Sequence, residues 1–383
     1  MSIILEQQYT LLDSDVETPI SMYLRHVGTE QGILLESAEV DGRWGRYSVI
    51  AGNFLLRLGC SNGLLEVACR DPRLEPLKKF AGMPFMEGLR LLMGELEIAS
   101  TAPESLPPIT RGLYGYFGYG MAGVFEPKLA AALTPKDAEC CLVLPGTLML
   151  FDHQYNKVCR LSLSNLPGAK KEGDTITSLL PANIGKVTAS MEKDSYVRVV
   201  EDLKRQIGQG ECIQVVPSVR FQAPFEGEPF TLYRRLRRIN PSPYLFFMRL
   251  PGMTLMGSSP EVMVGCQEGK LRLNPIAGTR PRGCSEGEDN LFEGELMNDA
   301  KEQAEHVMLV DLGRNDLGKV AVPGSVTLER YMEVERFSHV MHLTSYITAA
   351  LADGKDALDV LAAVFPAGTV SGAPKIRAME LIA

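Results

Sequence analysis

Two acidic side chains three positions apart, Glu302 and Glu305, are the first candidates for chemistry in this chain of 383 residues. The pattern around them predicts a helix over 299–312, so both carboxylates project from one face. The second half of this helix, 307–312, is apolar on nearly every side, which indicates burial. Buried carboxylates need a cation, hydrogen bonds or a metal, and oxygen ligands of this kind suit Mg²⁺. The alternative is a solvated helix start that pairs them with Lys301 or an arginine.

His339 and His342 form a second pair at the same spacing. Without a third nitrogen or sulfur ligand nearby, this spacing is only a weak indication of zinc. A positioned acid or base and a hydrogen-bonded core histidine are both compatible with it. The eight cysteines contain no C-x-x-C pair, so they predict reduced, mostly buried thiols and no metal or redox site.

Two segments rich in small residues could hold an anion. In Gly368–Lys375, Ala373 and Pro374 separate the last glycine from the lysine, so the segment is not a Walker phosphate loop. Its backbone N–H groups and hydroxyls nevertheless suit a carboxylate or a phosphate. The segment Gly278–Arg282 adds a close backbone approach and two arginines. We expect the two loops to receive an acidic small molecule beside the metal.

The elements that must position these residues are clearest in the second half. Asp194 is a good N-cap for a helix that ends at Gly208. A strand predicted at 212–221 places Gln214 on the face opposite its apolar residues. Another strand, with alternating leucines, runs into the loop at 274–279.

Composition restricts the class of protein. The chain is 45% hydrophobic and 22% charged, which is typical of a globular protein. A formal charge of −8 provides no general attraction for nucleic acid. The N-terminus has no basic or long apolar segment typical of a secretion signal, and no apolar run is long enough for a membrane helix. We therefore expect a soluble, cytoplasmic protein that binds neither nucleic acid nor membrane.

A polar, Pro- and Gly-containing stretch at 164–190 predicts a loop or domain junction. We expect an N-terminal lobe over 1–165, interleaved with the second lobe, and a catalytic domain over 190–383.

Several segments of the second half resemble the chorismate-utilising enzymes and, within them, the large component of anthranilate synthase. They follow in the family's order over nearly all of 195–383. The resemblance implies an α+β protein of two lobes, with large, mainly antiparallel β-sheets in layers flanked by helices. The matching segments are Gly210–Ser218, Gly257–Glu261, Pro275–Gly283, Glu305–Gly318, Ser338–Leu343 and Gly368–Lys375.

Two positions separate the branches of this family. Relatives that add water to chorismate carry a lysine base at the place of Gln214, and a neutral amide cannot deprotonate water. Relatives that make the 4-amino product for folate synthesis carry a lysine nucleophile at the place of Ala277, and alanine offers none. The resemblance therefore favours direct attack of ammonia beside the ring carboxylate, which yields anthranilate.

The resemblance also assigns roles. It implies that Glu305 is a direct Mg²⁺ ligand, with Glu302 a second one acting largely through water. Glu261 matches the acid that protonates the departing 4-hydroxyl, and His342 matches a histidine that orients the ring and assists loss of pyruvate. Glu302 and Thr369 complete the catalytic set. Donors to chorismate oxygens are expected at Gly278, Thr279 and Thr369.

In the first half, Leu34–Ser37 followed by Trp44–Ser48 resembles an element that binds feedback-inhibiting tryptophan, completed by Asn240–Tyr244. The carboxylate of Glu36 and the hydroxyl of Ser37 suit the amino group of an amino acid. A wall of proline and tyrosine suits an indole. The expected allosteric residues are Leu35, Glu36, Ser37, Pro243, Tyr244 and Leu245.

The activity implied is conversion of chorismate and ammonia to anthranilate and pyruvate, the first committed step of tryptophan biosynthesis, by a lyase. Ammonia is expected from glutamine through a separate amidotransferase subunit. In the family the chain continues well beyond 379–382, so a fold incomplete at the C-terminus is also expected. The alternatives are the 4-amino synthase of folate biosynthesis and a truncated, non-catalytic tryptophan-binding remnant.

Overall fold

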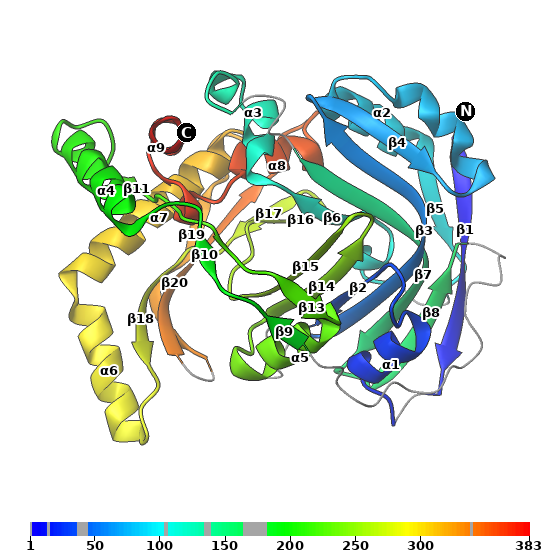
Figure 1. Cartoon of the computed structure of the whole chain (residues 1–383), viewed down its shortest axis with the longest axis horizontal. Helices are drawn as coiled ribbons and strands as arrows, with labels where there is room; N and C mark the ends of the chain where they lie inside the picture. The colour runs from blue at the N-terminus through cyan, green and yellow to red at the C-terminus, as the bar shows by residue number, and fades with distance from the viewer. Residues whose placement is uncertain are drawn as a thin grey trace. The chain divides into compact units, whose positions relative to one another are not determined.

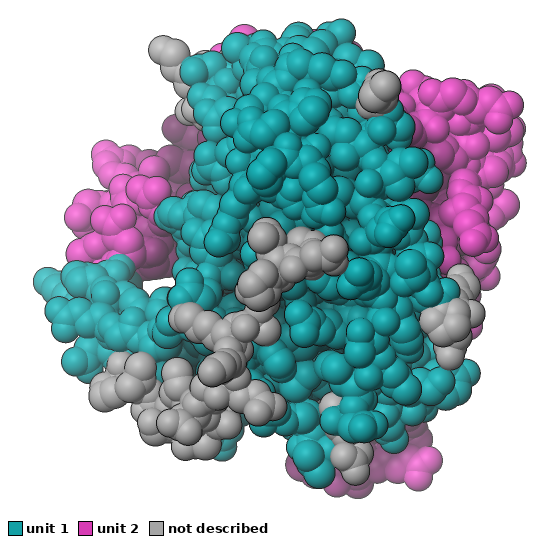
Figure 2. All heavy atoms as spheres, turned by 90° about the vertical axis from the view of Figure 1, so that its right-hand side faces the viewer, with its two compact units in different colours: residues 1–121, 135–187, 223–260 teal, residues 122–134, 188–222, 261–383 magenta. Residues whose placement is uncertain are grey.

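The structure, a computed structural model, describes residues 2–13, 16–36, 45–102, 106–133, 139–163, 182–337 and 340–383. The chain divides into two compact units, coloured separately in Figure 2. Their segments alternate along the sequence, so neither unit is one continuous half of the chain. Unit 1 contains Met1–Met121, Pro135–Val187 and Ala223–Pro260, and unit 2 contains Ala122–Thr134, Thr188–Gln222 and Glu261–Ala383.

Unit 1 is built on a 10-stranded sheet in the order β15-β14-β2-β3-β7-β8-β1-β5, with β4 on β3 and β6 on β7. Only the β1–β5 pair is parallel among the described strands, so the predicted mainly antiparallel sheet is confirmed. The strands of unit 1 are β1 (Ile3–Leu12), β2 (Gly32–Glu36), β3 (Tyr47–Ser61), β4 (Leu64–Cys69), β5 (Leu96–Ser100), β6 (Tyr114–Phe117), β7 (Cys140–Asp152), β8 (Lys157–Ser162), β9 (Ala182–Ile184), β13 (Phe225–Gly227), β14 (Tyr244–Leu250) and β15 (Met253–Ser259).

Amphipathic helices bury their apolar faces in unit 1. In α5, Phe230 and Tyr233 are buried beside Tyr23 of α1 and Phe247 of β14, with ring centroids 4.6 to 5.7 Å apart. Aromatic packing of this kind adds to the free energy gained by burying apolar surface, and it fixes α5 on the sheet. The helices of unit 1 are α1 (Pro19–His26), α2 (Phe85–Glu95) and α5 (Pro229–Ile239), with 3-10 turns η1 (Pro72–Phe80), η2 (Pro108–Thr110) and η3 (Tyr119–Met121).

Unit 2 contains a five-stranded sheet in which β20 pairs with β17, β18 and β19. The strand predicted at 212–221 is wrong as one element, because only 214–215 and 221–222 are strands. Pro217 interrupts it, since proline donates no backbone hydrogen bond. The strands are β10 (Thr188–Ala189), β11 (Gln214–Val215), β12 (Phe221–Gln222), β16 (Gly265–Gln267), β17 (Lys270–Leu273), β18 (Ile276–Pro281), β19 (Thr327–Arg336), β20 (Val340–Ala350) and β21 (Gly372–Ala373).

The predicted helices of unit 2 are confirmed, with shifted ends. The first begins at Lys193 with Glu192 as its N-cap, so the prediction of Asp194 as the cap is wrong, and Asp194 lies in the first turn. The helix predicted over 299–312 extends to Gly318. The helices are α3 (Ala122–Phe125), α4 (Lys193–Gly208), α6 (Glu286–Asn298), α7 (Ala300–Gly318), α8 (Ala357–Val364) and α9 (Lys375–Ile382), with η4 (Pro127–Leu129) and η5 (Gly368–Val370).

Helix α7 packs on β18 and β20 of this sheet, as Figure 1 shows. His306, Leu309, Val310 and Gly313 are buried, whereas Val307 is 46% exposed. The helix is therefore buried along one face and not on every side. Its buried face is the one that positions the candidate site.

No helix in the described part of the chain is both long and apolar enough to cross a membrane.

Candidate active site

The start of α7 is held by Asp299, its N-cap. The Asp299 carboxylate accepts hydrogen bonds from the backbone N–H of Lys301 at 3.0 Å and of Glu302 at 3.2 Å. The guanidinium of Arg280 on β18 donates to the same carboxylate at 2.8 Å. These backbone N–H groups and this arginine hold the pKa of Asp299 below its usual range. The cap thus fixes the first turn of α7, which carries Glu302, against β18.

Gly278 lets the backbone of β18 approach that turn closely. Its φ is +73°, and the register against β20 shifts between Ala277 and Thr279. A Cβ at this position would lie 3.0 Å from Leu296 Cδ1 and 3.2 Å from Glu302 Oε2. Glycine is therefore required by both conformation and space. The structure brings the predicted residues Gly278 and Glu302 together.

His342 on β20 completes this group. Its Nδ1 lies 2.9 Å from the Gly278 carbonyl oxygen and 3.0 Å from Thr279 Oγ1. A carbonyl only accepts, so the Gly278 contact places a proton on Nδ1, and in the neutral ring the lone pair then lies on Nε2. The ring is half-buried and in edge contact with Phe337 at 5.4 Å. His342 is thus a positioned base or hydrogen-bond acceptor, whereas its expected neighbour His339 lies outside the described residues.

One turn further along α7, Glu305 faces β11. The amide Nε2 of Gln214 lies 3.5 Å from Glu305 Oε1, at the outer limit of a hydrogen bond. The other amide atom, Gln214 Oε1, is buried with no hydrogen-bond partner among the described residues. Gln214 therefore presents an unused acceptor beside the glutamate predicted to bind metal.

Glu302 and Glu305 are both half-buried, and neither forms an ion pair with a described lysine or arginine. Pairing with Lys301 or an arginine, the alternative weighed from the sequence, is thus not what the structure shows. No described group of three or more His, Cys, Asp or Glu side chains could enclose a metal ion. Two carboxylates fit Mg²⁺, which commonly takes one or two and keeps water or substrate oxygens on its other positions.

Glu261 and Thr369 form the second part of the site. They line a cavity of about 30 Å³ together with Leu309 and Asp316 of α7. Burial raises the pKa of Glu261 from 4.5 to about 7, and a hydrogen bond from Thr369 opposes that rise. A carboxyl group with this pKa is protonated in a large share of molecules at neutral pH, as a general acid must be.

This raised pKa predicts a pH-dependent cost to folding. The unfolded chain releases the Glu261 proton near pH 4.5, whereas the folded chain keeps it to about pH 7, so stability falls as pH rises through this window. The difference corresponds to about 3 kcal/mol. We expect Glu261→Gln to match the wild type in unfolding free energy near pH 4.5 and to exceed it by up to that amount at pH 8. Denaturant unfolding at both pH values measures this difference. Equal unfolding free energies of the two proteins at pH 8 would contradict a pKa of Glu261 raised by burial.

The two arginines expected to attract an anion are engaged within the protein. Arg280 binds Asp299, and Arg282 binds Asp289 through both Nε and Nη2. Asp289 also accepts from the Gly283 N–H, and these contacts lower its pKa to about 2. The expectation that both cations serve a substrate is therefore corrected, because they join β18 to α6 and α7.

The lysine that ends the Gly368–Lys375 segment is also internal. Lys375 is 6% exposed, and its ammonium binds Asp316 Oδ2 at 2.5 Å and the Val364 carbonyl at 2.8 Å. Sequence reasoning gave Asp316 no role. The signal was present in the pattern, because an aspartate on an apolar helix needs a cation.

In unit 1, the two halves of the expected tryptophan element lie on neighbouring strands. Strands β2 and β14 pair so that Leu35 lies opposite Phe246 and Glu36 opposite Leu245. Side chains alternate along a strand, so Leu35 and Tyr244 share one face and Glu36 and Leu245 the other. Pro243 precedes β14 directly, and Ser37 lies outside the described residues.

The Glu36 side chain does not have the role expected for it. It is buried, and its Oε2 accepts from the Tyr233 hydroxyl at 2.6 Å and from Arg237 Nε at 3.1 Å. Both donors belong to α5. The carboxylate expected to receive an amino group therefore already fixes α5 to β2, since a buried charge needs such partners.

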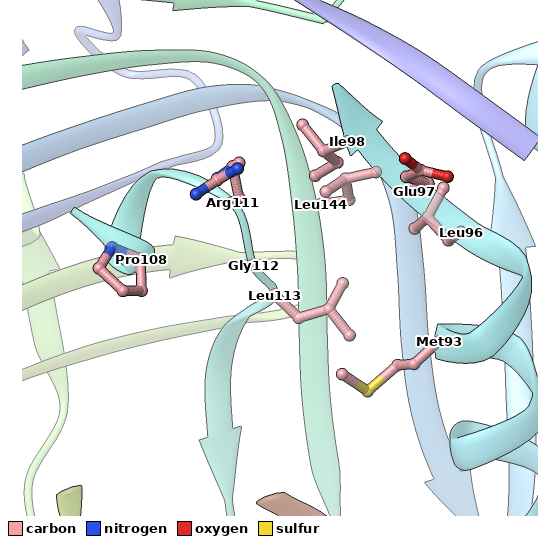
Figure 3. Close-up of a pocket in the computed structure, with 9 residues that line it drawn as sticks. All are labelled: Met93, Leu96, Glu97, Ile98, Pro108, Arg111, Gly112, Leu113 and Leu144. Atoms are coloured by element: carbon pink, nitrogen blue, oxygen red, sulfur yellow. The ribbon is translucent and has the colours of Figure 1, made fainter. Parts of the chain in front are cut away.

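Unit 1 has a larger hollow of about 400 Å³, shown in Figure 3. Leucine, isoleucine and methionine side chains dominate its lining, with Glu97 and Arg111 as the charged members. None of the residues predicted to bind chorismate or tryptophan lines it. The polar residues predicted to act on chorismate lie instead at the α7 site.

The comparisons with known proteins identify the family of this chain. The sequence matches the family described as chorismate binding enzyme over residues 84–383. It is 38% identical to anthranilate synthase component 1 of Aquifex aeolicus, over 98% of this chain and 79% of that one. The component 1 of Pseudomonas aeruginosa is 36% identical, over 96% of this chain and 79% of that one.

Solved structures show the same fold. Anthranilate synthase component I from Streptococcus pneumoniae matches with a TM-score of 0.69 and 30% identity, over 97% of this chain and 83% of that one. The menaquinone-specific isochorismate synthase of Escherichia coli matches over 99% of this chain and 79% of that one, with a TM-score of 0.69 and 16% identity. The chain therefore belongs to the chorismate binding enzymes and, among them, to the anthranilate synthase component 1 family.

Proposed function

We propose that this protein converts chorismate and ammonia to anthranilate and pyruvate through the site on α7. The observation that carries the proposal is Glu261, a half-buried carboxyl beside Thr369, whose pKa is raised by burial to about 7. Such a group can protonate the 4-hydroxyl of chorismate, which leaves as water while ammonia adds next to the ring carboxylate.

The other side chains orient the ring and hold protons. We assign to Gly278 and Thr279 the binding of substrate oxygens, and to His342 a place against the ring. Its Nε2 lone pair can take a proton when pyruvate is lost, because Nδ1 is held by the Gly278 carbonyl. This keeps acid and base roles on different elements, with Glu261 as acid and His342 as base.

Two residues favour ammonia over other nucleophiles. Gln214 Oε1 is a buried acceptor with no partner among the described residues, and ammonia can donate an N–H to it. An amide cannot deprotonate water, which disfavours the addition of water to chorismate. Ala277 is 8% exposed and has no nucleophile, which disfavours the 4-amino synthase of folate biosynthesis.

We propose that Glu305 and Glu302 hold a Mg²⁺ ion. When bound, the ion compensates the charge of the substrate's ring carboxylate. The two glutamates fit this role because they are half-buried, share one helix face and pair with no described cation.

We further propose that ammonia comes from glutamine through a separate amidotransferase subunit. The name component 1 of the relatives supports a second component. The cytoplasmic location stays a prediction from the sequence.

The test uses purified protein with chorismate, Mg²⁺ and ammonium, and follows anthranilate by fluorescence and mass. Formation of anthranilate with equimolar pyruvate is expected. A 4-amino product would support the folate alternative instead. No product, together with tryptophan binding, would support the non-catalytic alternative.

We also propose that tryptophan binds in unit 1 at the Leu35–Tyr244 face. Tyr244 is half-buried, and burial raises the pKa of its hydroxyl to about 12. With Pro243 it offers an apolar wall for an indole. The main chain of Glu36 and the side chain of Ser37 are nearby in sequence, whereas the Glu36 carboxylate is occupied by α5.

Replacing Tyr244 by Ala is expected to weaken tryptophan binding by about 10- to 100-fold, because such aromatic contacts contribute ~1 to 3 kcal/mol. Isothermal titration calorimetry with tryptophan measures this. Phe225→Ala, at an exposed aromatic of the same unit, is the matched control and should bind as the wild type. Unchanged affinity in the Tyr244 variant would remove the site from this face.

A further inference from the structure

The loop that carries Thr369 is closed by a buried ion pair that no part of the proposed reaction uses. This loop, residues 365–374, joins α8 to α9. Lys375, the first residue of α9, binds the carbonyl of Val364, the last residue of α8, at 2.8 Å. Its ammonium also binds Asp316 on α7. One side chain thus connects both ends of the loop to the helix that carries the candidate metal ligands.

The same helix face meets the loop at a second place. Asp316, Leu312 and Thr369 line one cavity with Glu261. A Cβ at Gly368 would lie 1.7 Å from Leu312 Cδ2, so the loop backbone rests directly on α7. Movement of the loop away from α7 would therefore carry Thr369 away from Glu261.

Burial makes this contact specific to Lys375. The side chains of Lys375 and Asp316 are 6% and 5% exposed. A second lysine, Lys319, binds the same carboxylate at 3.1 Å and the Ala363 carbonyl of α8 at 3.3 Å. Its side chain is 43% exposed, however, and it lies at the end of α7, outside the loop. Buried ion pairs are costly to form unless geometry fixes both partners, and here Lys375 is also held by the Val364 carbonyl.

We propose that Lys375 and Asp316 are positioning residues that hold the loop against α7 and so keep Thr369 beside Glu261 in the candidate site. The inference rests on the proposed function for its catalytic meaning. The positioning itself can be measured without turnover. Neither residue is expected to contact chorismate, because the two charges form a buried ion pair with each other.

The variants are chosen to separate positioning from folding. Lys375→Met alone leaves Asp316 with one exposed partner, and this single variant can fail to fold. The double variant Asp316→Leu with Lys375→Met removes both charges and replaces them by apolar side chains, a change that buried ion pairs often tolerate. Lys319→Met is the matched control, since it removes the other lysine on the same carboxylate.

The first readout is the pH dependence of unfolding, measured for each protein with and without Glu261→Gln. The difference between the two curves reports the titration of Glu261. The Thr369 hydrogen bond lowers this pKa, so its loss should raise the midpoint by about one pH unit in the double variant and in Thr369→Val. Lys319→Met should keep the wild-type midpoint.

The second readout is the pH profile of kcat for anthranilate formation. The double variant should lose about 10-fold or more in kcat, with its basic limb moved upward as in Thr369→Val. Adding Thr369→Val to the double variant should cause no further loss of kcat, because both changes act through one hydrogen bond. A folded double variant with the wild-type midpoint, or effects that multiply, would overturn the inference. Absence of activity in the wild type would refute the proposed function, while the unfolding midpoints would still decide the positioning role.

Discussion

Replacing Glu261 by Gln is expected to lower kcat for anthranilate formation by about 10²- to 10⁴-fold, the range typical of a lost general acid. Glutamine keeps the size and hydrogen-bonding capacity of the side chain but cannot deliver a proton. In the wild type, activity should decline as pH rises through about 7, because Glu261 must be protonated to act. The residual rate of the variant should not show this decline with rising pH. Steady-state kinetics between pH 5.5 and 9 would measure both effects.

The control for this variant is Glu295→Gln, a glutamate exposed on α6. It should retain the wild-type rate and pH profile. A Glu261→Gln protein with wild-type kcat would mean that another group protonates the 4-hydroxyl. Fluorescence or calorimetric titration with chorismate should give similar affinity for both variants, since the change removes a proton donor and not a charge from the protonated site.

Replacing Glu305 by Gln is expected to lower the affinity for Mg²⁺ by about 100-fold or more. Even substitutions of residues that surround the ligands of a metal commonly lower its affinity by about 10- to 100-fold. An amide oxygen carries no full charge and binds a hard cation less strongly. Direct binding of Mn²⁺ as a spectroscopic substitute would measure the loss without turnover. Thermal unfolding with and without Mg²⁺ and chorismate gives a second measurement, since a ligand that binds the folded state raises Tm.

Asp311→Asn is the matched control on the same helix, where the Asp311 side chain is 79% exposed. It should bind Mn²⁺ as the wild type does. If Glu305→Gln also bound the ion with wild-type affinity, the two glutamates would have to be reassigned to contacts with the protein or the substrate. Because α7 begins at the Asp299 cap, the helix itself should be intact in both variants.

Local sequence patterns predicted many residues of the candidate site. The spacing of Glu302 and Glu305 places them on one face of α7, and the small residues of 278 and 368 mark the positions where backbone approaches helix side chains. Periodicity of this kind depends only on helix and strand geometry, so sequence alone can reveal it. The resemblance of six segments then connected these local patterns to a family, which the comparisons confirm.

Other features depended on partners far away in the chain. Glu36 looked like a ligand for an amino group, but Tyr233 and Arg237 bind its carboxylate. The arginines of the 278–282 segment looked free for substrate, but Asp299 and Asp289 bind them. A charged residue's role depends on which opposite charge reaches it, and strand or helix periodicity does not encode that.

By itself the sequence determined the elements of this protein, the turns that need glycine and the family to which it belongs, because these follow from local geometry and from residue identity. The tertiary structure decided which polar groups are already satisfied. It directed the charges of Glu36, Arg280, Arg282 and Lys375 inward. Among the described residues, it left Glu302 and Glu305 without a cationic partner and the buried amide oxygen of Gln214 without a hydrogen-bond donor. The physical reason is that desolvation penalises every buried charge or dipole until a partner is found, and the fold supplies such partners to some groups and withholds them from others.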